Sequence, residues 1–87
     1  MLRRGAAEAL EIIAHGDAKS SKVVGRSIAE LNLPKGVHIG ALVRGDEVLI
    51  AHRDVVIESE DHVIIFLADK TQIPAVESMF QVGFGFF

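Results

Sequence analysis

The chain has 87 residues, 49% of them hydrophobic and 6% aromatic, with no cysteine and a net charge of −3 at pH 7. A chain of this length forms one domain, and the absence of cysteine excludes a disulfide framework and thiolate chemistry. The net negative charge gives no electrostatic footprint for nucleic acid, whose binding needs a clustered basic face, so nucleic acid is disfavoured as a partner.

No segment of the sequence is suited to cross a membrane or to direct secretion. The longest apolar run, residues 63–68, is far shorter than the roughly 18 residues that a transmembrane helix needs. The opening MLRRGAAEAL has no long apolar segment after its arginines, so it does not resemble a signal peptide. Because charged and small residues lead directly into an apolar segment, we expect residues 1–87 to be a single domain from a larger protein.

The first part of the chain is predicted to contain one strand and one short helix. Residues 8–15, EALEIIAH, alternate in polarity and predict a strand, although the alanine-rich start makes a helix the rival. Ser27 and Glu30 have the S-x-x-E spacing of a capping box. The short helix that they begin is expected to end at Asn32, because Pro34 disfavours helical geometry in the residue before it.

Two apolar runs around Gly45-Asp46 give the strongest local signal in the sequence. Residues 37–43 and residues 47–51 each alternate with a period of two, as strands do. A Gly-Asp pair between two such runs predicts a β-hairpin. The alternation predicts that one face of the first strand carries Val37, Ile39, Ala41 and Val43, and that the other carries His38, Gly40, Leu42 and Arg44.

A third strand and a second helix complete the predicted domain. Residues 62–67, HVIIFL, predict a strand that is apolar on both faces. Residues 71–81 predict a helix, with Thr71 or Asp69 as its N-cap and Pro74 in its first turn. The whole order indicates the α+β class, with a small mixed or antiparallel sheet, a β-hairpin and two helices. The apolar stripe of the second helix consists of Ile73, Val76, Met79 and Phe80.

The two-faced third strand also predicts self-association. Two helices can cover one face of the sheet, but 87 residues leave too little chain to cover the other face completely. An apolar sheet face that stays uncovered is suited to pairing with a second copy of itself. We therefore expect a homodimer.

The polar residues give little support to catalysis. His52 with Asp54, and His62 beside Asp61, imitate a base and its orienting carboxylate, but no serine stands in a nucleophile context such as G-x-S-x-G. A small hydrolase that uses His52 or His62 is therefore an alternative function, but the sequence offers it no nucleophile. The chain has four histidines without the local spacing of a zinc site: His15, His38, His52 and His62.

Two further segments are expected to be structural. The acidic loop with Glu58, Glu60 and Asp61 lacks the alternating ligands of a calcium-binding loop, so it is expected to be a solvated turn. Gly83-Phe84-Gly85 is followed by no helix that could receive a phosphate, so it is expected to be a C-terminal tail, frayed or docked through its phenylalanines. We assign no metal ligand and no catalytic residue.

Residues 25–31 (GRSIAEL), Leu33-Pro34 and residues 36–44 (GVHIGALVR) resemble the C-terminal domain of the RCK family, the regulators of potassium conductance. The resemblance extends over about residues 8–81, and within the family it points to the TrkA-C domains of bacterial Trk potassium uptake. Many members carry Gly-Asp before the last strand, where this chain has Glu60-Asp61. Because glycine permits positive φ and glutamate disfavours it, Glu60 predicts a different turn.

The resemblance implies a regulatory domain that is not an enzyme, in the cytoplasmic subunit of a Trk-type potassium uptake system. That subunit would lie at the inner membrane through its partner, the Trk-type potassium channel subunit. NAD(H) or an adenine nucleotide would be bound only by N-terminal domains of the parent, and this fragment would hold no cofactor, since it has no G-x-G-x-x-G after a strand.

Arg44 is the one candidate ligand-binding residue, because it matches an arginine that contacts a nucleotide ligand in some relatives. The competing interpretation is an exposed charge beside the hairpin turn. Two alternative functions also stay open. One is the ligand-binding C-terminal domain of another cation channel or antiporter, and the other is an adhesion module that displays Arg44-Gly45-Asp46 at an exposed tip.

Overall fold

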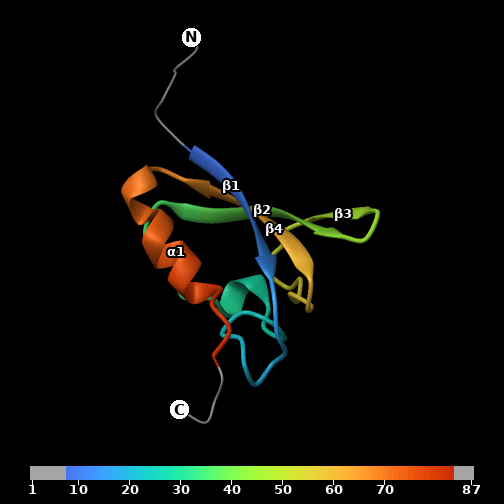
Figure 1. The fold of residues 1–87 in the computed structure, drawn as a ribbon. Helices are drawn as coiled ribbons and strands as arrows, with labels where there is room; N and C mark the ends of the chain where they lie inside the picture. The colour runs from blue at the N-terminus through green and yellow to red at the C-terminus, as the bar shows by residue number, and fades with distance from the viewer. Residues whose placement is uncertain (1–7, 84–87) are drawn as a thin grey trace.

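Four strands form one antiparallel sheet in the computed structural model, which describes residues 8–83 (Figure 1). The strands are β1 (Glu8–Ala14), β2 (Val37–Arg44), β3 (Glu47–Ile50) and β4 (Asp61–Leu67), and the helices are the 3-10 helices η1 (Ile28–Glu30) and η2 (Lys70–Gln72) and the α-helix α1 (Ile73–Met79). In the sheet the strands lie in the order β1, β4, β2, β3, and each neighbouring pair is antiparallel. The predicted α+β class and order of elements are confirmed.

The hydrophobic core lies between one face of the sheet, called here the inner face, and a layer formed by α1 and the loops. The register places Val63 and Ile65 of β4 on the inner face, where both are fully buried. From the other layer Val76 and Phe80 are buried against them, so the predicted helical stripe faces the core. The remaining buried apolar residues are Ala14, Val23, Val24, Val37, Ile39, Leu42, Ile57 and Leu67.

A β-bulge at Gly40 interrupts the pairing of β2 with β4. Ile39 pairs with Ile65. The next residue of β4, Ile64, pairs with Ala41, so Gly40 is an extra residue on β2. Glycine suits this position because a side chain would collide with the ring of Phe66 on the adjacent strand.

The bulge reverses the alternation of side chains in the second half of β2. Leu42 is fully buried on the inner face together with Val37, whereas Ala41 and Val43 lie on the outer face and are partly exposed. The prediction that one face carries Val37, Ala41 and Val43 together is therefore wrong. One inserted residue shifts every later side chain to the opposite face, and the period of two holds only on each side of the insertion.

The predicted hairpin is confirmed, with Gly45 and Asp46 as the two residues between β2 and β3. Arg44 pairs with Glu47 directly across the turn. Gly45 has a φ of 60°, and Asp46 is not among the residues with positive φ. A positive φ at the first turn position alone is typical of the type II′ turn, whose twist matches that of the flanking strands.

Both predicted helix starts are present, but the first helix is shorter than expected. The Glu30 carboxylate accepts hydrogen bonds from the Ser27 amide at 2.8 Å and from the Ser27 hydroxyl at 2.9 Å. Only the three residues of η1 follow, so the helix does not reach Asn32. At the second helix the Asp69 carboxylate accepts from the Thr71 amide at 2.9 Å, which confirms Asp69 as the cap, and Pro74 lies in the first turn of α1.

At the beginning of the described chain, the strand predicted for residues 8–15 is confirmed as β1. Of the predicted C-terminal tail, Phe84 and Gly85 lie outside the described residues, and Gly83 donates its amide to the Ser20 carbonyl at 2.8 Å. Between residues 8 and 83 no helix is long and apolar enough to cross a membrane.

Candidate functional site: the Arg44 network and the open sheet face

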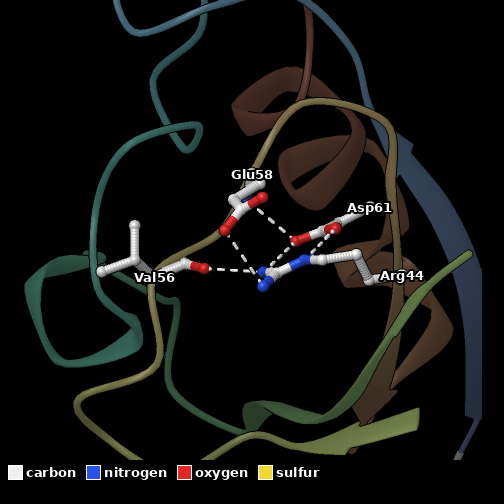
Figure 2. A network of polar contacts seen from close by, with 4 residues as sticks. All are labelled: Arg44, Val56, Glu58 and Asp61. Carbon is white, nitrogen blue, oxygen red and sulfur yellow. Dashed lines mark hydrogen bonds and ion pairs between the residues drawn. The ribbon is translucent and has the colours of Figure 1, made fainter. Parts of the chain in front are cut away.

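The bulge at Gly40 places Arg44 on the inner face of the sheet. Arg44 follows the buried Leu42 by two residues, so the two side chains share a face. Asp61, the first residue of β4, lies on the same face, as the register of β4 requires. Figure 2 shows the Arg44 side chain directed at Asp61 and at the loop that leads into β4.

The Arg44 guanidinium contacts three groups. Its Nε and Nη2 atoms each donate to one carboxylate oxygen of Asp61 at 2.8 Å, which is the bidentate geometry that favours arginine over lysine. Nη2 also donates to the Val56 carbonyl at 2.9 Å, and Nη1 lies 3.1 Å from the Glu58 carboxylate. The Glu58 amide donates to Asp61 at 2.8 Å. This Arg44 network, formed by Arg44, Val56, Glu58 and Asp61, fastens the loop before β4 to the end of β2.

Asp61 is the buried anion of the Arg44 network. Its side chain is 1% exposed, whereas that of Arg44 is 31% exposed. Burial raises the pKa of the Asp61 carboxyl, but the hydrogen bonds from Arg44 and from the Glu58 amide outweigh burial and hold this pKa below its ordinary value. The hydrogen bonds to Asp61 raise the pKa of Arg44 despite its desolvation. At neutral pH the network is therefore an ion pair with a buried carboxylate.

The network gives Arg44 a structural role that the sequence did not reveal. Its side chain points inward, so the interpretation as an exposed charge beside the turn is wrong. Of Arg44-Gly45-Asp46 only Gly45 and Asp46 are exposed, which opposes the display of the three residues as an adhesion tripeptide. Ligand binding by Arg44 stays a prediction, and an anionic ligand would have to displace Glu58, whose side chain is 63% exposed.

The other candidate polar groups do not converge on one site. His62 pairs with the Glu11 carboxylate of β1 on the outer face, whereas Asp61 lies on the inner face. His62 and Asp61 therefore do not form a pair of a base and its orienting carboxylate. His52 and Asp54 are both exposed. Within residues 8–83 no three histidine, aspartate or glutamate side chains come together in a way that could hold a metal ion.

The acidic loop before β4 is only partly the solvated turn that the sequence predicts. Glu58 and Glu60 are exposed, but Asp61 is buried. Glu60 has a φ of 69°, and its carboxylate lies 2.7 Å from Nδ1 of His15. The prediction that glutamate changes this turn is wrong, because Glu60 adopts the positive φ that a glycine would permit. The fixed ends of the loop, Glu58 and Asp61, impose that conformation.

We expect Glu60→Gly to be more stable than Glu60→Ala by about 1 kcal/mol. Both substitutions remove the exposed pair with His15, which contributes about 0.5 kcal/mol. Only glycine also removes the cost of a left-handed conformation, which is about 1–2 kcal/mol for an L-residue. Part of this gain is offset because glycine has more conformational freedom in the unfolded chain. Urea denaturation of the two variants measures the difference, and an alanine variant as stable as the glycine variant would show that the turn relaxes.

The second feature of the site is the open face, the sheet face opposite α1. Antiparallel register places one apolar set on it, from all four strands. Val48 is 64% exposed, Ile50 62% and Phe66 48%, which is unusual for large apolar residues of a sheet. Polar groups of His38, Glu11 and His62 lie among them. The apolar set of the open face consists of Ala9, Ile13, Ala41, Val43, Val48, Ile50, Ile64 and Phe66.

Sequence reasoning anticipated an uncovered apolar face but missed both Asp61 as the partner of Arg44 and the bulge. A signal was present for each. A lone glycine inside an alternating strand indicates a bulge, and Gly40 is such a residue. An acidic residue directly before an apolar strand is a candidate partner for a cation on the neighbouring strand, but only the bulge brings Arg44 to that face.

Comparison with known sequences identifies close relatives. Residues 17–81 match the family model of the TrkA-C domain. The chain is 67% identical over 86 residues to the Trk system potassium uptake protein TrkA of Halomonas elongata, a match that covers 99% of this chain and 19% of that protein. It is 60% identical over 80 residues to the protein of the same name from Vibrio alginolyticus, covering 92% of this chain and 18% of that protein. The chain thus spans about a fifth of the length of the curated relatives it matches.

Two solved structures share the fold. The first is described as the RCK_C domain dimer of S. agalactiae BusR in complex with c-di-AMP, with a TM-score of 0.66 at 29% identity over 83% of this chain and 93% of that chain. The second is S. agalactiae BusR in complex with its busA-promotor DNA, with a TM-score of 0.70 at 26% identity over 92% of this chain and 40% of that chain. The DNA belongs to that protein, and the exclusion of nucleic acid for this chain stays a prediction.

Proposed function

Because the chain belongs to the TrkA-C domain family, we propose that it is the regulatory and pairing domain of a Trk-type potassium uptake regulator. In this proposal residues 1–87 are one non-catalytic domain of a longer cytoplasmic subunit. The observation that carries the proposal is the open face, on which Val48, Ile50 and Phe66 are exposed although they stand on the strands of a sheet.

Pairing through the open face follows from the cost of leaving it in water. Burial of apolar surface contributes about 25 cal/mol per Å², and α1 and the loops already occupy the inner face. A second copy presents the same apolar set, so a two-fold interface would be self-complementary. The solved BusR relative described as an RCK_C domain dimer supports pairing by this fold.

The regulatory role would reside in the relation between the two paired copies. A signal from the rest of the subunit, where NAD(H) or an adenine nucleotide would bind, changes a paired arrangement only if it has different affinities for two arrangements. The pair would pass that change to the Trk-type channel subunit, through which the regulator would lie at the inner membrane. The domain itself would contribute a stable connection, in which the Arg44 network fastens the loop before β4 to the end of the neighbouring central strand, β2.

Substitution of the two most exposed large apolar residues of the open face tests the pairing. We expect the 87-residue chain to be a dimer in sedimentation velocity, and Val48→Lys/Ile50→Lys to weaken the dimer by about 100-fold, because two charges would enter an apolar interface. Both side chains are more than 60% exposed, so the fold of each copy should be kept.

Val56→Lys is the matched control for this test. Val56 is also an exposed apolar residue, at 44%, but it lies outside the four strands and off the open face. Only its backbone carbonyl takes part in the Arg44 network, so replacement of its side chain keeps that hydrogen bond. This variant should dimerise like the unmodified chain. Pairing through the open face would be contradicted if the unmodified chain were monomeric at all accessible concentrations. It would also be contradicted if Val56→Lys weakened the dimer as much as Val48→Lys/Ile50→Lys does.

The wider function is tested in the full-length parent. We expect the parent to capture a Trk-type channel subunit from detergent extracts, and the Val48→Lys/Ile50→Lys parent to capture less of it, with the Val56→Lys parent as control. If the Val48→Lys/Ile50→Lys parent no longer paired but still captured as much channel subunit, the domain would have only a structural role. The same comparison separates the proposal from the alternative of another cation channel or antiporter.

A further inference from the structure

A pocket lined by basic residues shares no lining residue with the open face or the Arg44 network. The loop after β1 and the segment from the end of α1 to Gly83 enclose about 390 Å³, and no residue of a strand lines this space. Its charged lining residues are Lys19, Lys22 and Arg26, and none is acidic. This local excess of positive charge stands out in a chain with 12 acidic residues and 9 basic ones.

The three cations of this basic pocket have no salt bridge within residues 8–83. Arg26 is instead held by neutral groups, because its Nη1 donates to the Ser21 carbonyl at 3.1 Å. The nearby Glu30 carboxylate is occupied by the Ser27 amide and hydroxyl. Asp17 and Glu30 lie near Lys19 and Arg26, but among residues 8–83 neither carboxylate forms a salt bridge with them. Cations that gather around one concave surface without a salt bridge are available to an external anion.

The loop that carries the cations is held in one conformation. The Asp17 carboxylate accepts from the amides of Lys19 and Ser20, each at 2.9 Å. The buried Ser21 hydroxyl accepts from the amides of Val23 and Val24, each at 3.1 Å. Gly83 donates to the Ser20 carbonyl and joins the C-terminal segment to the loop. A preformed loop lowers the conformational cost of binding.

We propose that the basic pocket binds a small molecule that carries a phosphate group, with Lys19, Lys22 and Arg26 contacting the phosphate. Two lysines and an arginine supply the charged donors that phosphate oxygens accept. Ser78 and Gln81 line the same pocket, and a hydroxyl and an amide side chain can form neutral hydrogen bonds with the rest of the ligand. The volume lies within the range of small-molecule sites, about 300–1,000 Å³. This proposal does not depend on pairing, because the open face contributes nothing to the pocket.

Amide chemical shifts of the 87-residue chain test the site. The probes are inorganic phosphate, pyrophosphate and adenosine monophosphate, titrated at constant ionic strength. We expect shifts of the amides of residues 19–26 and 78–83, and tighter binding of the nucleotide than of phosphate if the neutral groups of the pocket take part. Tighter binding of pyrophosphate than of the nucleotide would instead assign the site to a polyphosphate group.

Two double variants with the same change of net charge give the decisive comparison. Lys19→Gln/Lys22→Gln should weaken binding at least about tenfold, because two charged hydrogen bonds are lost. Lys35→Gln/Lys70→Gln removes two exposed lysines outside the pocket and should leave the affinity unchanged. The absence of shifts at millimolar pyrophosphate, shifts centred elsewhere, or equal weakening by both variants would overturn the proposal. A monomeric but phosphate-binding chain would refute pairing and leave this site intact.

Discussion

Replacing Arg44 with methionine is expected to lower the free energy of unfolding by about 3 kcal/mol. The substitution leaves the Asp61 carboxylate, which is 1% exposed, without its cation. Removal of one partner from a buried ion pair costs about 3–5 kcal/mol, and the partial exposure of Arg44 places this case at the lower end. For a domain of this size such a loss is a large part of the total stability. Urea denaturation at a fixed protein concentration measures it.

The pH dependence of the stability lost in Arg44→Met distinguishes the loss of the ion pair from the loss of side-chain packing. In the unmodified chain the pKa of Asp61 is lowered, so its stabilisation is present above the ordinary pKa of about 3.9 and is lost as the pH falls through the lower folded value. Without Arg44, burial raises the pKa of Asp61, and protonation then removes the unpaired charge. The difference in stability between the two proteins should therefore shrink as the pH falls. Asp17, Glu30 and Asp69, whose pKa values are also lowered, titrate in both proteins and cancel.

Arg44→Met/Asp61→Asn is the matched second variant. Asparagine keeps an acceptor for the Glu58 amide but carries no charge, so the double variant should recover at least about 1 kcal/mol relative to Arg44→Met. A loss below about 1 kcal/mol for Arg44→Met with no dependence on pH would contradict a structural role. Arg44 would then be available for the ligand role that its match to relatives implies.

Local signals in the sequence predicted most of the fold. The hairpin followed from Gly45-Asp46 between two alternating runs, and the α1 face followed from the spacing of Val76 and Phe80. The family resemblance is confirmed by the match of residues 17–81. The first predicted helix shrank to the single turn of η1, since its cap was present but too few residues separate Glu30 from Pro34 to continue it.

The remainder depended on contacts between residues distant in sequence. Gly40 was a local signal of a bulge, but the alternation of β2 alone could not show the change of phase there, because the extra residue is defined only by pairing with β4. The inward position of Arg44 follows from that phase, so the sequence could not assign its partner. Positive φ at Glu60 opposes local preference and is imposed by the loop closed through Glu58 and Asp61. These three failures therefore lie within a few residues of the Arg44 network or of the bulge that creates it, unlike the early end of the first helix.

The bulge itself supplies the second large expected effect: Gly40→Ala should lower the free energy of unfolding by about 2 kcal/mol. A methyl group on Gly40 would lie 2.3 Å from Cε2 and 3.0 Å from Cδ2 of Phe66. The Phe66 ring is half-exposed, so it can turn toward solvent, but it then loses its contact with the bulged backbone. Gly83→Ala is the control, because there the nearest atom outside the adjacent residues, the Ser20 carbonyl oxygen, would lie 3.8 Å away.

A double-mutant cycle with Phe66→Leu identifies the cause of this loss. Leucine has no ring atoms at the colliding positions, so Gly40→Ala should cost little in that background, with a coupling energy of at least about 1 kcal/mol. The measurements are made in the Val48→Lys/Ile50→Lys chain, because Phe66 lies on the open face and dimer formation would otherwise add to the apparent stability. An equal cost of Gly40→Ala in both backgrounds would show that the glycine is required by the backbone geometry of the bulge, and that Phe66 merely covers it.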